Sequence, residues 1–302
     1  MGDLALLGLL DPDEGPARER WAVRRGEFER LQELLNPPGD VPLVQDKRLF
    51  EQTCRERDLP TPAVLAVLAR AGDSDLVFVG RSPECLFDYL SGLMEGVAGA
   101  PSLTLMHFSA PRTPAEDLAK QHKPELDALL GYFAAERLDP KAIASFGKQV
   151  CFIDVASTGQ TFGTLVDYLR YWTRVEGADW NVVQRRIGFV GLTWREQTGP
   201  KVWRWWQHQD WVKELTKTPV KNVAIPGQFW GYIANNDEKV TPSHWLKRWA
   251  SIDATMPNRA DHRLRGLRLA LDNYDRGRDR EERARFVSEL TQLPEMREGW
   301  LR

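Results

Sequence analysis

The sequence predicts an α/β protein with a mostly parallel five-stranded sheet flanked by helices, and with helical additions at both ends. Short apolar runs alternate with amphipathic stretches between residues 74 and 226, which is the pattern of a mostly parallel sheet. Charged stretches with helical spacing lie on either side of this region. The expected strands are residues 76–79, 103–108, 149–153, 187–193 and 220–225, and the expected helices between them are residues 83–97, 114–135 and 160–174.

Outside the alternating region, the helical additions have recognisable ends. A Pro-Pro-Gly breaker closes the first amphipathic stretch, and Pro60 follows the second. The expected helices here are residues 14–35, 46–57, 259–271 and 278–290. The chain therefore divides into a helical N-terminal extension, an α/β core and a helical C-terminal cap, at residues 1–73, 74–226 and 227–302.

Composition is that of a globular protein, with 302 residues, 42% hydrophobic and 28% charged. No apolar run reaches the length of a membrane span, and the short apolar opening lacks the basic start of a signal peptide. The three cysteines, Cys54, Cys85 and Cys151, are odd in number and scattered, so we expect reduced thiols and a cytoplasmic location. A net charge of −2 argues against nucleic acid as a partner. The sequence contains no Gly-x-x-x-x-Gly-Lys phosphate-binding loop, no Gly-x-Gly-x-x-Gly dinucleotide-binding motif and no Gly-x-Ser-x-Gly motif of serine hydrolases. It also has no set of Cys and His residues with the spacing of a zinc site.

The stretch from residue 150 to residue 161 reads as a strand, a short loop and the start of a helix. Residues 150–153 are continuously apolar, as in a strand buried on both faces, and Asp154 follows them. Small hydroxyl residues and Gly159 come next, and Gly159 allows close approach of a ligand. Exposed N–H groups at a helix start favour an anion, and ligands collect at the carboxyl ends of parallel strands. The stretch predicts a site for a ligand with hydroxyls and a phosphate, or else an ordinary connection with a threonine cap.

The same stretch resembles the PRPP-binding signature of type I phosphoribosyltransferases, in which four apolar residues, two acids and three variable residues precede Thr-Gly-x-Thr. The resemblance implies that Asp154 holds the ribose hydroxyls, contacts Mg²⁺ and takes part in catalysis. Ile153 departs from the signature because it stands where the first acid is expected, which weakens hydroxyl or Mg²⁺ binding. By resemblance, the 5′-phosphate is bound by Ser157, Thr158, Gly159, Gln160 and Thr161.

A second loop suited to anions follows the expected strand at residues 76–79. Gly80, Arg81 and Ser82 come directly after it, with Ser82 as the expected N-cap of the next helix. In its position after a strand and in the kind of residues that it contains, the loop resembles the pyrophosphate-binding loop that phosphoribosyltransferases carry after their first core strand. The resemblance implies that these three residues bind pyrophosphate, with Arg81 as a bidentate donor and a catalytic residue. From the residues alone, a glycine turn beside a solvated arginine is the alternative.

Tryptophan is concentrated between residues 194 and 249, with basic residues interleaved. The aromatic faces could stack a planar acceptor beside the sugar-phosphate site, or single-stranded nucleic acid. They could instead pack the C-terminal helices onto the sheet, or form the subunit interface of a homodimer. The residues are Trp194, Trp203, Trp205, Trp206, Trp211, Trp230, Trp245 and Trp249, with Lys201, Arg204, His208 and Lys213 between them.

Together these features predict a PRPP- or nucleotide-binding enzyme that resembles phosphoribosyltransferases and uses Mg²⁺. It would transfer a ribosyl 5-phosphate group to a nitrogenous acceptor, or remove one. The alternative, which Ile153 favours, is a non-catalytic sensor that binds PRPP or a nucleotide on the same fold. A third reading, an aromatic-rich interaction or nucleic-acid-binding protein, is opposed by the net charge.

Overall fold

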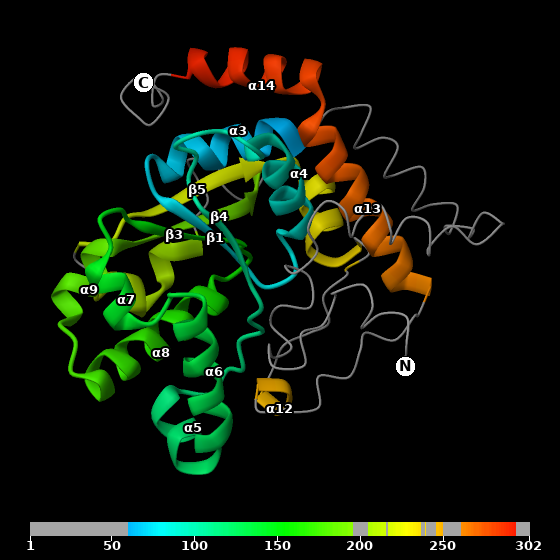
Figure 1. Cartoon of the computed structure of the whole chain (residues 1–302). Coiled ribbons are helices and arrows are strands. Elements are labelled where there is room, and N and C mark those ends of the chain that lie inside the picture. The colour runs from blue at the N-terminus through cyan, green and yellow to red at the C-terminus, as the bar shows by residue number, and fades with distance from the viewer. Residues whose placement is uncertain are drawn as a thin grey trace.

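The computed structural model describes residues 60–195, 205–215, 217–236, 239, 246–249 and 261–293. Within these residues five strands form one parallel sheet in the order β2-β1-β3-β4-β5, which confirms the predicted fold class (Figure 1). The strands are β1 (Asp75–Val79), β2 (Leu103–Met106), β3 (Val150–Val155), β4 (Ile187–Trp194) and β5 (Val220–Ile225). All five expected strands are present, and their ends differ from the expected ones by two residues or fewer.

Helices cover both faces of the sheet, so its strands are buried on both sides (Figure 1). The helices are α3 (Pro60–Ala71), α4 (Glu84–Met94), α5 (Ala115–Gln121), α6 (Lys123–Ala135), α7 (Pro140–Ser145), α8 (Gln160–Glu176), α9 (Trp180–Arg186), α10 (Asp210–Lys213), α11 (Gly227–Gly231), α12 (Leu246–Trp249), α13 (Asp261–Arg278) and α14 (Arg280–Gln292), with short turns η3 (Trp205–His208) and η4 (Tyr232–Asn236). Neighbouring strand residues point to opposite faces, as Ile153 and Phe152 do. Both are fully buried, which explains why the strand sequences are continuously apolar.

The connections after β1 and after β3 leave the sheet on opposite faces. From β1 the chain enters α4, whose Leu86 and Leu90 join the core on the face of α3. From β3 it enters α8, whose Leu165 and Leu169 join the core on the other face. Because β1 and β3 are neighbours, the sheet has a topological switch point between them. In open α/β sheets this is where ligands bind, outside the carboxyl ends of the strands.

Several helix boundaries differ from the expected ones. The single helix expected at residues 114–135 is two helices, α5 and α6, because Pro124 cannot continue a helix and lies instead in the first turn of α6. Helices α7 and α9 were not expected, although Asp139 and Asp179 cap them with side-chain bonds of 3.1 Å and 2.8 Å to backbone N–H groups. Val97, the last residue of the helix expected at residues 83–97, lies beyond the end of α4 and is 41% exposed.

The described part of the C-terminal cap packs against the core. Helix α13 crosses α4 so closely that a Cβ on Gly92 would lie 2.1 Å from the Tyr274 carbonyl oxygen, and one on Gly277 would lie 2.2 Å from the Tyr89 carbonyl oxygen. Helix α14 adds Phe286 to the core on the face of α3 and α4. The helices expected at residues 14–35 and 46–57 lie outside the described residues, and the division into three stretches stays a prediction.

Candidate functional site

Asp154 lies near the carboxyl end of β3, opposite Gly191 of β4. It is 8% exposed, and its carboxylate accepts a 2.7 Å hydrogen bond from the backbone N–H of Val155. Burial raises the pKa of Asp154 to about 7, although hydrogen bonds from Val155 and the Thr161 side chain act in the opposite direction. Near neutral pH this carboxyl group therefore exists in both protonation states, so it can donate a hydrogen bond to a ligand hydroxyl or accept one from it.

The loop after β3 presents the start of a long helix to solvent. Gly159 adopts a left-handed conformation with φ +74°, as expected, and precedes the 17-residue helix α8. No side chain caps α8, so the threonine cap considered from the sequence is absent. Ser157, Thr158 and Gln160 are exposed, and the first turn of α8 contains no acidic residue. The loop therefore has uncapped N–H groups and hydroxyls beside Asp154, which is a favourable arrangement for an anion.

The protein itself fills the space on one side of Gly159. The sequence predicts that Gly159 admits a ligand close to its backbone, but the Cα side of Gly159 faces Trp205. A Cβ built on Gly159 would lie 2.2 Å from ring atom Cε3 of Trp205. The protein's own tryptophan thus makes a close approach to this glycine, while Ser157 and Thr158 of the same loop are exposed.

The loop after β1 lies at the same edge but differs in detail. Gly80 has φ +71°, and a Cβ there would lie 2.9 Å from the Phe108 carbonyl oxygen, so the positive φ and the packing against the segment after β2 explain this glycine. Arg81 is exposed. Ser82 does not cap α4 as expected, because Pro83 stands at the cap position without a side-chain bond. Arg81 therefore stays available for a ligand, whereas the hydroxyl of Ser82 has no capping role.

Two charged residues that were not predicted as site residues, Lys239 and Glu84, lie at the loop after β1. The Lys239 Nζ donates to the Ser82 carbonyl oxygen at 3.5 Å and to the Ile233 carbonyl oxygen at 3.0 Å. Glu84, in the first turn of α4, is 3% exposed. No local sequence pattern links Lys239 to this loop, so only the fold could reveal the contact. The position of Glu84, by contrast, could be read from the sequence, because it is the second residue of the helix expected at residues 83–97.

Ile153 lies on the opposite face of the sheet from Asp154. It is fully buried, pairs with Phe78 of β1 and belongs to the core under α3 and α4. The position that corresponds to the first acid of the phosphoribosyltransferase signature thus faces apolar side chains. Asp154 is consequently the one carboxylate that β3 brings to this edge.

Several of the described tryptophans pack on other aromatic rings. Trp211 lies 5.5 Å from the Phe189 ring, and Trp249 stacks on Phe108 at 6.2 Å. Trp194 stacks on Trp230 at 6.1 Å. These contacts favour the packing interpretation of the aromatic segment. The other expected members Trp203, Trp245, Lys201 and Arg204 lie outside the described residues.

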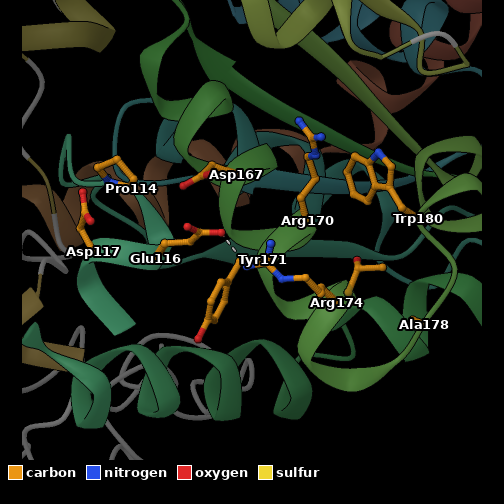
Figure 2. Close-up of a pocket in the computed structure, with 10 residues that line it drawn as sticks. Pro114, Glu116, Asp117, Asp167, Arg170, Tyr171, Arg174, Ala178 and Trp180 are labelled. Carbon is orange, nitrogen blue, oxygen red and sulfur yellow. Dashed lines mark hydrogen bonds and ion pairs between the residues drawn. The ribbon is translucent and has the colours of Figure 1, made fainter. Parts of the chain in front are cut away.

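A cavity of about 620 Å³ lies elsewhere, on the outer side of α8 (Figure 2). Its basic residues, Arg170 and Arg174, form ion pairs with Glu214 and Glu116, the second at 2.8 Å. The lining comprises Pro114, Glu116, Asp117, Asp167, Arg170, Tyr171, Thr173, Arg174, Ala178 and Trp180. It contains none of the predicted site residues, so we regard it as a separate surface groove.

No protein-family model, curated protein or solved structure matches this chain. In the part that the structure describes, no three His, Cys, Asp or Glu side chains gather as a metal site. Among the described helices, none combines the length and apolar character that crossing a membrane requires. The fold and the edge site therefore define the class: a parallel α/β protein with a candidate anion site at its topological switch point.

Proposed function

We propose that this protein binds a ligand with a ribose 5-phosphate group, such as PRPP or a nucleotide, at the carboxyl ends of β1 and β3. The observation that carries the proposal is the uncapped N-terminus of α8, which directly follows the buried Asp154 at the switch point. Helix N–H groups favour the phosphate, and a carboxyl group that can donate and accept hydrogen bonds suits ribose hydroxyls.

Each part of the ligand has a proposed partner. The 5′-phosphate would bind the loop at residues 157–161, and the ribose would bind Asp154. The pyrophosphate of PRPP would bind Gly80, Arg81 and Ser82. Mg²⁺ would accompany PRPP with Asp154 as the single protein carboxylate, because magnesium in phosphate sites commonly uses one or two carboxylates together with ligand phosphates.

The reaction that the resemblance implies is transfer of the ribosyl 5-phosphate group. A nitrogen atom of the acceptor would form a bond to the anomeric carbon as the bond to pyrophosphate breaks, and pyrophosphate would leave with the bonding electrons. The protein would hold both partners in place and stabilise charge on the leaving group through Arg81. The buried free thiol of Cys151 fits a reducing compartment, so we propose the cytoplasm.

A non-catalytic sensor of PRPP or a nucleotide is the second candidate, and one observation favours it. Ile153 occupies the place of the first acid and is fully buried in the core. A single carboxylate gives the sugar fewer contacts in the transition state than the usual pair. Binding requires less of the site than catalysis does, so the loss of one acid would affect transfer more than affinity.

Calorimetry with ribose 5-phosphate and with PRPP plus Mg²⁺ tests the binding proposal. Thr158→Val and Asp154→Asn should each weaken ribose 5-phosphate about tenfold or more, since a hydrogen bond to a charged group contributes about 1.5–3 kcal/mol. Thr291→Val and Asp127→Asn, at exposed positions on α14 and α6, serve as matched controls. If both site variants bind as well as the wild type, the site is wrongly assigned. If PRPP binds, an assay of pyrophosphate release with a panel of bases distinguishes a transferase, which releases pyrophosphate, from a sensor, which does not.

A further inference from the structure

The side chain of Trp205 lies next to the proposed ligand site, at the carboxyl-end edge of the sheet. It is 9% exposed, and its ring packs against Gly159 of the β3 loop and Gly191 of β4. A Cβ on Gly191 would lie 2.8 Å from the indole Nε1. Gly191 is the residue paired with Asp154 in the sheet. The indole therefore spans the space between the proposed phosphate loop and the strand beside the proposed ribose site.

We infer that Trp205 occupies a nucleobase position in this site and makes the protein select ribose phosphates over nucleotides. This inference rests on the proposed function, because it specifies which ligands the same site accepts. An indole is a planar fused ring system of nearly the size of a purine. The indole meets Gly191 of β4 and donates to Asn222 of β5, so it lies on the side of Asp154 away from the loop after β1. If the ribose bound Asp154 and the pyrophosphate bound the loop after β1, a base would extend toward this side.

Asn222 of β5 supports a base-binding position. Its Oδ1 accepts a 2.6 Å hydrogen bond from the Trp205 Nε1–H. Its Nδ2 is buried and has no hydrogen-bond partner among the described residues. A carboxamide offers an acceptor and a donor side by side, and indole can satisfy only the acceptor because it has a single N–H and no acceptor. A nucleobase edge with a neighbouring donor and acceptor would satisfy both groups of Asn222.

The walls around Trp205 are also suited to a flat ring. The Phe162 ring centre lies 5.6 Å from Trp205, and that of Trp211 lies 6.1 Å away. Gly159 and Gly191 offer flat backbone surfaces without side chains. Removing the indole would leave an aromatic-lined slot, and apolar cavities made in this way can bind aromatic molecules.

Binding of ribose 5-phosphate and of nucleoside 5′-monophosphates tests the inference. In the wild type, ribose 5-phosphate should bind about tenfold or more tightly than the adenosine, guanosine, cytidine or uridine monophosphates, since the base has no place to stack. Trp205→Ala should bind at least one monophosphate about tenfold more tightly than the wild type does, which is the scale of one base stacked on aromatic rings. Its affinity for ribose 5-phosphate should change by less than about threefold. Trp180→Ala, on α9 outside the site, is the matched control.

Two further measurements keep the test decisive. Free indole should compete with the monophosphate in Trp205→Ala, but it should not compete with ribose 5-phosphate. Adding Asn222→Leu to Trp205→Ala should remove the gained monophosphate affinity. If Trp205→Ala does not fold, Trp205→Phe frees the Asn222 edge and should shift the same preference by about threefold. If ribose 5-phosphate binds and the preference does not change, the inference is overturned while the proposed function stands. If no ligand binds to any folded form, the proposed function itself fails.

Discussion

The loops after β1 and after β3 reach the same edge of the sheet, yet they differ as anion sites. Each contains a glycine with positive φ, and each precedes a helix without a side-chain cap. The first turn of α4 contains the buried Glu84, whereas the first turn of α8 contains no acid. An acid at a helix N-terminus occupies the positive end of the helix dipole, where a bound anion would otherwise sit. The β3 loop is therefore the better phosphate site.

The two loops are also held in place differently. Helix α4 is fixed by the C-terminal helices, since Gly92 meets Gly277 of α13 and the Arg283 side chain donates to the Gly92 carbonyl oxygen at 2.6 Å. At the β3 loop, the Trp205 side chain covers Gly159, whereas Ser157 and Thr158 stay exposed. Helix α4 is thus held by contacts between helix backbones, whereas the β3 loop is held at Gly159 by one buried side chain, Trp205, which also packs against Phe162 of α8.

Asp154→Asn should give the largest effect, seen as a change in the pH dependence of stability. Burial raises the folded-state pKa to about 7, compared with 3.8 for an ordinary aspartate, so ionisation destabilises the folded protein increasingly between these values. The full difference corresponds to about 4 kcal/mol and is reached above about pH 7. Asparagine does not ionise, so the variant should gain stability relative to the wild type as pH rises. Urea unfolding at about pH 5 and about pH 8 measures this.

Asp127→Asn is the control for that experiment, because Asp127 is exposed on α6. Its unfolding free energy should follow the wild type at both pH values. If the free energies of unfolding of Asp154→Asn and the wild type differed by the same amount at both pH values, ionisation of Asp154 would not destabilise the folded protein. Asp154 would then not be the buried acid that we describe at the end of β3.

Gly92→Ala should lower the free energy of unfolding by about 3 kcal/mol, because its Cβ meets the Tyr274 carbonyl oxygen and forces α4 and α13 apart. Chemical denaturation measures the loss. Gly131→Ala is the matched control, since Gly131 also lies inside a helix but has open space around it. That control should gain about 0.5–1 kcal/mol from the helix preference of alanine. Equal effects would show that α13 does not hold α4 this closely.

Tyr89→Phe should lower the free energy of unfolding by about 1.5 kcal/mol. The Tyr89 hydroxyl is bonded to Thr61 at 2.9 Å and donates to the Glu282 carboxylate, so it links α3, α4 and α14. Phenylalanine keeps the ring in the core and removes only these bonds. Thermal unfolding is a suitable measurement, with Tyr171→Phe on the outer side of α8 as control. If the loss of stability were no larger than that of the control, the hydrogen bonds of Tyr89 would not contribute, and side-chain packing alone would hold α4 against α3 and α14.

Gln160→Glu should have the smallest effect on stability and would make α8 resemble α4. An acid in the first turn should stabilise α8 by about 0.3–1 kcal/mol through the helix dipole. It should also weaken ribose 5-phosphate binding about two- to fivefold, because the acid takes the place of the phosphate. Gln292→Glu, at the exposed C-terminal end of α14, is the control and should not change binding. Unchanged affinity in Gln160→Glu would remove the difference that we draw between the two loops.

Much of the fold could be predicted because buried parallel strands are continuous apolar runs. The strand at residues 220–225 was predicted with the bounds that it has, and Gly80 and Asp154 lie at the ends of two predicted strands. That these two strands are neighbours came from the structure. Helices α7 and α9 were missed because each is short, although their Asp139 and Asp179 caps were visible in the sequence. The contact between Gly159 and Trp205 was not predicted because the two residues are distant along the chain.

The sequence by itself determined the five strands, the two glycine-containing loops and the absence of an acid at position 153. Apolar periodicity and backbone preferences are local properties, so they can be read along the chain. Only the tertiary structure decided that Ile153 faces the core, that Asp154 is buried enough to have a raised pKa, and that Trp205 packs against Gly159 of the β3 loop. These properties depend on burial by residues far apart in the sequence, and burial exists only once the sheet and its helices have packed.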